Sequence, residues 1–438
     1  MNQKLLNLFE KSKIDNRIDH HLYTKHNVKK GLRNEDGTGV LIGLTRIADV
    51  VGYVRDEQNH KINCEGDLIY RSYPIKEVVE KALIDHRYGY EKVCFLLLFG
   101  HFPEEDEFNE FLNELNSHRL PDGFLASNIL AHPSNHLMNM LQSLLLQLYC
   151  TDANAENNSP ENTLSVGLSI LARFPALMCY SWQAKSHFIE GNSLVIHSVN
   201  PDLSIAENIL HLLRPDGTFD QMEAELLDLL LILHADHGSG NNSTFANLVV
   251  ASTGTDLYSA TAASIGSLKG PKHGGANITC RKMMQMLVED LGCNASDEMM
   301  KEAIDQLLKK ELFDHSGLIY GFGHAVYTLS DPRCGILKKE AYQLAVKKGN
   351  VAEFEFYQRF EKLVKERFVQ DGRRSICANV DFYSGLVYDM LNIPEDLVTP
   401  LFACSRNVGW LAHNIEEKLY SNRIIRPAGK FVKEEELK

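Results

Sequence analysis

Apolar residues at helical spacing are the feature that most constrains the fold of this chain. Residues 226–234 are apolar almost all round, which is typical of a buried helix. Residues 206–213 and 351–368 also repeat apolar side chains at helical spacing, and an Arg-Pro-Asp-Gly breaker follows the first of them. No alternation of strands with helices runs through the chain, so a doubly wound sheet is not expected. The pattern predicts an all-α fold, with short extended segments mainly near the N-terminus, around residues 39–54 and 68–73.

The length of the chain predicts two domains. Its 438 residues are enough for a large buried core. A glycine-rich turn at residues 270–275 precedes a charged helix that begins near residue 277. We therefore predict a large helical domain with a smaller helical domain inserted into it, divided as residues 1–275 (large), 276–378 (small) and 379–438 (return of the large domain).

Charge and cysteine usage exclude several classes of function. The net charge of −13 argues against a nucleic-acid binder, which would show a basic face. The charged N-terminus does not resemble a signal peptide, and the longest apolar run falls far short of the roughly 20 residues of a membrane span. The nine cysteines include no CxxC pair. We expect a reduced, cytoplasmic protein without a membrane anchor or a zinc site.

Two histidines lie in glycine-rich turns. His273 precedes the helix expected from residue 277, whose positive end disfavours a protonated imidazole. We therefore expect a neutral hydrogen-bond donor, which is what a forming enolate requires. His324 follows Gly321 and Gly323, which would let a substrate approach the backbone, while the missing third glycine argues against a dinucleotide loop. For each histidine a purely structural role in its turn stays open.

A carboxylate with apolar neighbours is a candidate base. Asp381 is flanked by Val380, Phe382 and Tyr383, and desolvation by such neighbours raises the basicity of a carboxylate. Its alternative role is a helix N-cap.

Three arginines are candidate carboxylate ligands. Arg333, Arg406 and Arg426 could each grip a carboxylate with a two-pronged hydrogen bond, and surface or ion-pair roles are the alternative. His234 and His237 have the spacing of a metal-binding pair, but no third ligand follows at metal spacing. No metal site is predicted.

Taken in order, the segments around these residues resemble the citrate synthase family. The resemblance rests on the stretches HADH..NNSTF, SLKGPKHGGAN, GFGHAVY..DPR, NVDFYSG and CSRNVGW.AHN. Weaker similarity upstream, in GVLIGLTRIADVVGY and CEGDLIYRSY, extends it to roughly residues 30–430. Several motifs in the correct order are far more specific than any lone pattern. The resemblance implies an almost entirely helical fold whose two domains close over the substrates and exclude water.

The resemblance also implies a reaction and roles for single residues. The family condenses acetyl-CoA with oxaloacetate and hydrolyses citryl-CoA to citrate and CoA, without a cofactor. His273 would bond the thioester carbonyl, Asp381 would remove the methyl proton, and His324 would polarise the ketone of oxaloacetate. Residues implied to bind oxaloacetate are His237, Arg333, Arg406 and Arg426, the last reaching the neighbouring subunit's site in a homodimer. Residues expected to meet CoA are Lys269, Lys272, Gly323 and Asn379.

The sequence departs from the family at three places. Gly238 and Ser239 follow HADH, where members often have an acidic residue, and the family's YRGY reads YRSY at residues 70–73. Thr328 occupies the position four residues beyond the second catalytic histidine, where members commonly carry Lys or Arg for the CoA phosphates. Lys269, Lys272 or Lys338 is expected to replace that contact.

Three alternatives stay open. The first is 2-methylcitrate synthase, which uses propionyl-CoA, since one methylene changes binding by only ~1–3 kcal/mol. The second is a metal-dependent hydrolase, which the missing third ligand and the absence of an HExxH motif disfavour. The third is a helical relative without turnover, although every aligned catalytic residue is present.

Overall fold

The computed structural model describes residues 2–119, 123–371, 376–421 and 423–436. Contacts divide the chain into two compact units. The main unit comprises residues 45–423, and the terminal unit combines residues 1–44 with residues 424–438. The predicted domain boundaries after residues 275 and 378 both fall inside the main unit, and that division stays a prediction.

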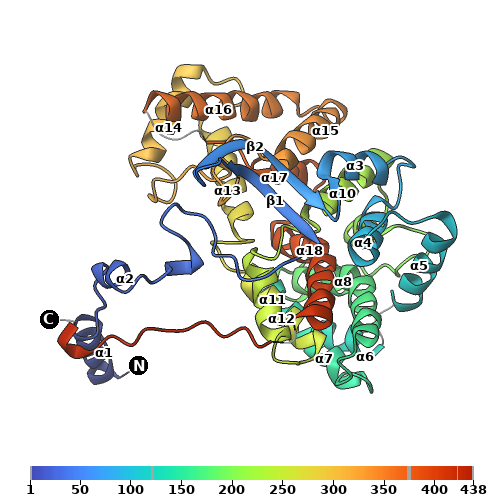
Figure 1. Cartoon of the computed structure of the whole chain (residues 1–438). Coiled ribbons are helices and arrows are strands. Elements are labelled where there is room, and N and C mark those ends of the chain that lie inside the picture. The colour runs from blue at the N-terminus through green and yellow to red at the C-terminus, as the bar shows by residue number, and fades with distance from the viewer. Residues whose placement is uncertain (1, 120–122, 372–375, 422, 437–438) are drawn as a thin grey trace. The chain divides into compact units, whose positions relative to one another are not determined.

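Helices make up most of the main unit, and the predicted all-α fold with short extended segments near the N-terminus is confirmed (Figure 1). In the main unit the helices before the long central helix are α3 (Ile75–Ala82), α4 (Gly89–Phe99), α5 (Glu105–His118), α6 (Gly123–Ala131) and α7 (Leu137–Thr151). The following ones are α8 (Pro160–Phe188), α9 (Ile205–Leu213), α10 (Gln221–His234), α11 (Asn242–Ala251), α12 (Leu257–Leu268), α13 (Ala276–Leu291) and α14 (Asp297–Leu308). The last are α15 (Pro332–Lys348), α16 (Val351–Gln370), α17 (Val380–Met390) and α18 (Glu395–Tyr420).

The core of the main unit is built around α8, α10 and α18. These helices are buried along most of their length. α8 and α10 are apolar on most sides, as a helix buried in a core must be, whereas α18 also carries buried polar side chains. In the part of the chain that the structure describes, α8 is the one helix long and apolar enough to cross a membrane. Because 83% of its most apolar window is buried inside the protein, α8 has the position of a core helix.

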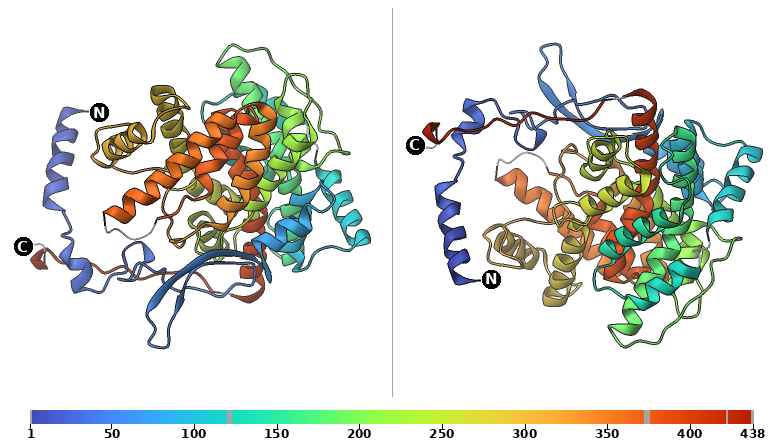
Figure 2. Two further views of the ribbon diagram at one scale, coloured as in Figure 1. Left: turned by 90° about the horizontal axis from the view of Figure 1, so that it is seen from above. Right: turned by 90° about the horizontal axis from the view of Figure 1, so that it is seen from below.

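A small antiparallel sheet packs on the loop that carries His324. It consists of β1 (Ala48–Arg55), β2 (Lys61–Tyr70) and β3 (Tyr73–Pro74), and β1 and β2 form a long ribbon (Figure 2). The ribbon comes so close to this loop that a Cβ on Gly52 would lie 2.5 Å from the carbonyl oxygen of Val326. A Cβ on Gly66 would meet the backbone of Ser330 in the same way. The two glycines therefore permit the sheet to hold this loop in place.

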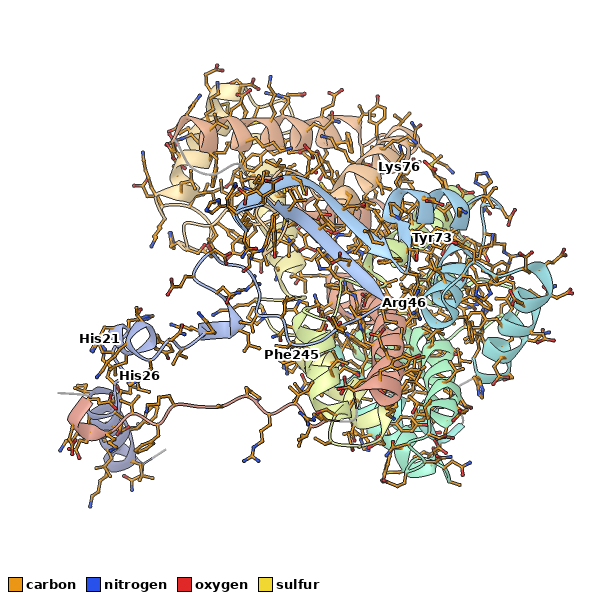
Figure 3. The ribbon with its side chains drawn as sticks, viewed as in Figure 1. His21, His26, Arg46, Tyr73, Lys76 and Phe245 are labelled. Atoms are coloured by element: carbon orange, nitrogen blue, oxygen red, sulfur yellow. The ribbon has the colours of Figure 1, made fainter. Side chains whose placement is uncertain are left out.

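The terminal unit brings the two ends of the chain together. It contains α1 (Gln3–Asp15), α2 (His21–Lys25) and the short 3-10 helices η1 (Lys30–Leu32) and η2 (Glu434–Glu436). The carboxylate of Glu436 accepts from Lys25 at 3.1 Å and contacts His26 at 2.8 Å. Figure 3 labels His26 and His21 in this unit. These charged contacts link the C-terminal segment to α2.

Candidate active site

His273 links the N-termini of α13 and α11. Its ring lies in the turn before α13, and its Nε2 is 3.1 Å from both the Oδ1 of Asn241 and the Oγ of Ser243. Asn241 is the N-cap of α11, and Ser243 also accepts a hydrogen bond of 3.2 Å from the indole of Trp410 in α18. The imidazole is therefore anchored through Nε2, and its Nδ1 faces away from these two side chains.

The His273 ring is neutral at physiological pH. Burial, followed by the positive charge of Arg406, lowers its pKa to about 4. The sequence predicts a neutral ring because of the helix end that follows it, whereas burial and an arginine distant in the chain are the principal causes in the structure. A neutral imidazole held at one nitrogen can present a hydrogen-bond donor at the other.

A second set of contacts joins the N-termini of α13, α17 and α15. Asn277 in the first turn of α13 donates to the Oδ1 of Asp381 in α17 over 3.1 Å. The backbone N–H of Val380 donates over 3.2 Å to Asp331, which is the N-cap of α15. Four helix N-termini are thus tied together, and their partial positive charges favour an anionic ligand where they meet.

Asp381 is a carboxylate whose basicity is raised by its surroundings. Burial raises its pKa above the usual value, while the hydrogen bond from Asn277 and the charges of Arg333 and Arg406 offset part of that rise. The N-cap of α17 is Asn379, whose side chain accepts from the backbone N–H of Asp381 at 3.0 Å. The Asp381 carboxylate is therefore not needed as the cap and is available as a base.

The hydrogen bond from Asn277 gives a prediction about pH. In Asn277→Ala the pKa of Asp381 should rise further, because a contact that lowers it is lost. A base must be ionised to act, and activity falls as the pH drops through its pKa. The acid limb of the pH profile of kcat/KM should therefore move to higher pH.

The matched control for this measurement is Ser384→Ala. It removes the 2.5 Å bond between Asn277 and Ser384 but keeps the bond between Asn277 and Asp381. An acid limb that stays in place in Asn277→Ala, or that moves equally in the control, contradicts the assignment.

His324 is held as a donor through Nε2. Its Nδ1 accepts the backbone N–H groups of Val326 at 3.0 Å and Tyr327 at 3.1 Å, so the ring proton of the neutral form resides on Nε2. The Tyr327 ring stacks on the imidazole with a centroid distance of 4.6 Å. Gly321 and Gly323 both have φ of +82°, a conformation that favours glycine. A Cβ at Gly321 would collide with Cys280, so close packing explains this glycine.

His237 and Arg406 form the polar wall beside His324. The rings of His237 and His324 lie edge to face at 5.0 Å, and burial and the charge of Arg333 hold the pKa of His237 well below its usual value. Arg406 is fully buried, and burial lowers its pKa to about 10. Within the described residues, Nε2 of His237 and both Nη atoms of Arg406 are buried without a hydrogen-bond partner. Buried polar groups of this kind are suited to a ligand that carries carboxylates.

Arg333 makes its two-pronged bond inside the protein. Its Nε and Nη2 donate to the two carboxylate oxygens of Asp331 at 3.0 and 2.8 Å. Its guanidinium also lies 5.7 Å from the centroid of the Tyr327 ring. Arg333 therefore contributes its charge to this region, while much of its hydrogen-bonding capacity is used by Asp331.

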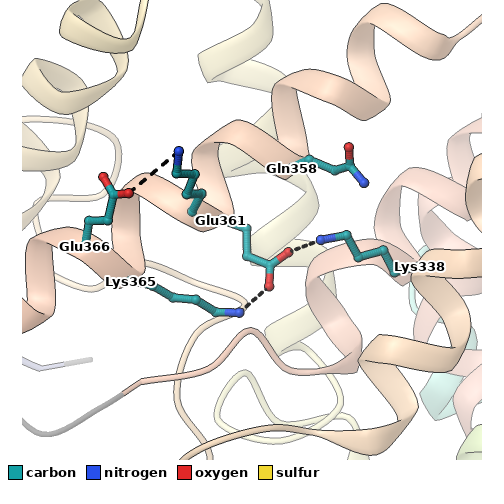
Figure 4. Close-up of a pocket in the computed structure, with 6 residues that line it drawn as sticks. Lys338, Gln358, Glu361, Lys365 and Glu366 are labelled. Carbon is teal, nitrogen blue, oxygen red and sulfur yellow. Dashed lines mark hydrogen bonds and ion pairs between the residues drawn. The ribbon is translucent and has the colours of Figure 1, made fainter.

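The predicted CoA lysines lie on the surface or in ion pairs. Lys269 donates to Asn139 at 2.8 Å, and Lys272 is exposed in the turn before His273. Lys338 donates over 2.7 Å to Glu361, which also accepts from Lys365 at 2.5 Å, beside a surface cavity of about 320 Å³ (Figure 4). This ion-pair cluster gives Lys338 a structural role between α15 and α16.

Two of the other predicted residues shape the His324 loop, and one lies in the other unit. The side chain of Asn379 donates to the carbonyl oxygen of Gly323 at 3.0 Å, so these residues join the loop to α17. Arg426 is exposed and belongs to the terminal unit. The placement of Arg426 in a neighbouring site therefore stays a prediction.

Several residues that hold the candidate groups in place are not predicted from the sequence. They are Asn241 and Ser243 at His273, Asn277 at Asp381, and Asp331 at Arg333. Each lies within or beside a motif that the sequence already singled out. Asn, Ser and Asp next to the start of a helix are the signal that could have found them, because such residues cap helices and orient nearby side chains.

His234 and His237, which have the spacing of a metal-binding pair, have different surroundings in the structure. The Nδ1 of His234 donates to the carbonyl oxygen of Leu230 at 2.8 Å, and burial lowers the pKa of His234 to about 3. His237 instead lies beside His324. No cluster of three His, Cys, Asp or Glu side chains suited to a metal occurs among the residues that the structure describes.

Comparison with known proteins identifies relatives along nearly the whole chain. Residues 36–428 match the family model described as citrate synthase, C-terminal domain. A citrate synthase of Synechocystis is 35% identical over 376 residues, covering 85% of this chain and 87% of that protein. A 2-methylcitrate synthase of Shewanella oneidensis is 32% identical over 366 residues, covering 83% and 88%. The ternary complex of carboxymethyl coenzyme A and oxaloacetate with citrate synthase from Thermoplasma acidophilum has a TM-score of 0.74 at 25% identity, covering 93% and 96%.

Proposed function

Because this chain belongs to the citrate synthase family and is therefore an acyltransferase, we propose that it condenses acetyl-CoA with oxaloacetate and hydrolyses citryl-CoA to citrate and CoA. The observation that carries the proposal is the meeting of the raised-pKa carboxylate of Asp381, the neutral rings of His273 and His237 and the buried guanidinium of Arg406 beside the joined helix N-termini. A ternary complex of the Thermoplasma relative contains oxaloacetate and a CoA derivative, which supports both substrate classes.

The first step is removal of a proton from the methyl group of the thioester. The Asp381 carboxylate takes the proton, the C–H electron pair forms the C=C bond of the enolate, and negative charge moves onto the thioester oxygen. Nδ1 of His273 would donate a hydrogen bond to that oxygen when the hydroxyl of Ser243 donates to Nε2 in place of its bond to Asn241. The neutral imidazole of His273 stabilises the developing negative charge by this hydrogen bond and keeps its own proton.

The second step forms the carbon–carbon bond. The enolate carbon attacks the ketone carbon of oxaloacetate: the C=C electron pair becomes the new C–C bond, the thioester carbonyl forms again, and the ketone oxygen takes up the electron pair of its own double bond and a proton from Nε2 of His324. The backbone N–H groups at Nδ1 fix this tautomer before the substrate arrives. His237 and Arg406 would hold the carboxylates of oxaloacetate. Water then attacks the thioester carbonyl of citryl-CoA and the C–S bond breaks; one proton of water ends on the thiol of CoA and the other restores the Nε2 proton of His324, while the proton taken by Asp381 leaves to solvent.

The identity of the acyl donor, acetyl-CoA or propionyl-CoA, is the most specific part of the proposal. Relatives include both citrate synthases and 2-methylcitrate synthases, so the acetyl preference is tested directly. With EDTA present, release of free thiol should be faster with acetyl-CoA than with propionyl-CoA, by about tenfold or more in kcat/KM. A preference for propionyl-CoA would transfer the assignment to 2-methylcitrate synthase. Activity lost on chelation would support a metal-dependent enzyme, and no thiol release with either donor would refute the proposal.

The proposal extends to assembly and location. We propose a cytoplasmic homodimer in which Arg426 enters the neighbouring subunit's site; its support is the family membership and the exposure of Arg426 in the terminal unit. Light scattering that showed a monomer under assay conditions would contradict the dimer.

A further inference from the structure

One face of α18 packs along the turn that carries His237. Arg406, Gly409 and His413 share this face, because they are spaced three and four residues apart. The Nε of Arg406 donates to the carbonyl oxygen of His234 at 2.6 Å. A Cβ on Gly409 would lie 2.4 Å from the Oδ1 of Asp236, so α18 closely approaches the turn at this point. Residues 406, 409 and 413 of α18 thus all lie against residues 234–236.

Asp236 is a fully buried carboxylate at the centre of this contact. Its Oδ2 accepts from the backbone N–H of Gly238 at 2.8 Å and contacts the Nε2 of His413 at 3.2 Å. Burial alone would raise its pKa, but the charge and hydrogen bond of His413, followed by the charge of Arg406, bring it below the usual value. Asp236 is therefore ionised at physiological pH.

Two buried and opposite charges stay apart in this arrangement. Oδ1 of Asp236 and both Nη atoms of Arg406 have no hydrogen-bond partner among the described residues. No ion pair within 4.0 Å joins Asp236 to Arg406 in the part of the chain described, although the charge of Asp236 raises the pKa of Arg406. Buried groups without partners are costly, so a mobile Asp236 would rotate to bond the guanidinium.

We propose that His413 is a positioning residue that holds the Asp236 carboxylate and so keeps the Arg406 guanidinium open for a carboxylate of the substrate. His413 is itself fixed in place. Its Nδ1 lies 3.4 Å from the Oγ1 of Thr45 and 3.9 Å from the carboxylate of Glu416, which accepts from the backbone of Arg46 at 2.8 Å. Arg46 is labelled in Figure 3, next to the start of β1. The inference rests on the proposed function, because the ligand of Arg406 is taken to be oxaloacetate.

Two amide substitutions separate the contact with Asp236 from the polarity of the side chain. His413→Gln places an amide nitrogen near the position of Nε2 and can still donate to Asp236. His413→Asn places its amide near Nδ1, so it loses that contact while the position remains polar. By calorimetric titration with oxaloacetate, Kd should rise about tenfold in His413→Asn and stay near the wild-type value in His413→Gln.

A second substitution tests whether the charge of Asp236 is the cause. Asp236→Asn removes the charge that competes for Arg406, so the double variant Asp236→Asn/His413→Asn should bind oxaloacetate more tightly than His413→Asn alone. Asn414→Ala is the control for a buried defect in the same helix, because it removes a 2.8 Å bond to Asn247 in α11. Its Kd for oxaloacetate should stay near the wild-type value.

Three results would overturn the inference. They are an unchanged Kd in His413→Asn, a double variant as weak as His413→Asn, and a Kd in Asn414→Ala that rises as much as in His413→Asn. The wild-type protein is measured by calorimetry and by thiol release in the same series. Wild-type binding without turnover would refute the proposed function alone, and absence of wild-type binding would refute both.

Discussion

Replacement of Asp381 by Asn should lower kcat by about 10²–10⁴-fold, the range expected when a positioned general base is lost. The amide keeps the size of the side chain and can bond to Asn277, but it has no basic oxygen for the methyl proton. KM for oxaloacetate should change little, since His237 and Arg406 are unaltered. The measurement is the initial rate of thiol release at saturating acetyl-CoA and oxaloacetate.

Asp389→Asn is the matched control for this substitution. Asp389 lies two turns further along α17, its carboxylate is bonded to Arg281 and Gln285, and its pKa is also raised by burial. The control therefore removes a charge of the same kind from the same helix, away from the base. If kcat falls equally in both variants, or if Asp381→Asn keeps more than a tenth of the wild-type rate, Asp381 is not the base.

Local sequence patterns predict the helices well but not the contacts between them. The glycine turn and the start of α13 can be recognised from residues 270–277 alone. The two partners of His273 lie 32 and 30 positions away in the chain, and the bonds from Asn277 to Asp381 and from His413 to Asp236 span 104 and 177 positions. Such pairs are set by how helices pack, which spacing along one segment does not encode.

The type of a single residue also does not determine which group its side chain binds. The two-pronged guanidinium of an arginine predicts a carboxylate ligand, but that carboxylate can belong to the protein itself, as Asp331 does for Arg333. Lys338 likewise has the charge for a phosphate and in the structure bonds Glu361. The three-dimensional structure decides whether such a side chain pairs inside the protein or is available to a ligand. The Nη atoms of Arg406 are buried and have no hydrogen-bond partner in the described part of the protein, so they are available.

Arg406→Lys should raise KM for oxaloacetate at least about thirtyfold, which corresponds to about 2 kcal/mol or more of lost binding free energy. Lysine keeps a positive charge but cannot make a two-pronged bond to a carboxylate. Burial already lowers the pKa of the Arg406 guanidinium to about 10, and the same burial lowers the pKa of an ammonium group. A group with a lowered pKa loses its charge as the pH rises, so the defect should grow towards alkaline pH.

Arg281→Lys separates this effect from the general cost of changing a buried arginine. Arg281 is buried in α13 and pairs with Asp389, away from His237 and His324. KM for oxaloacetate should remain close to the wild-type value in that control, and KM for acetyl-CoA should change much less than KM for oxaloacetate in Arg406→Lys. A rise confined to acetyl-CoA would mean that Arg406 binds the thioester, and the two substrates would then have to be exchanged in the site.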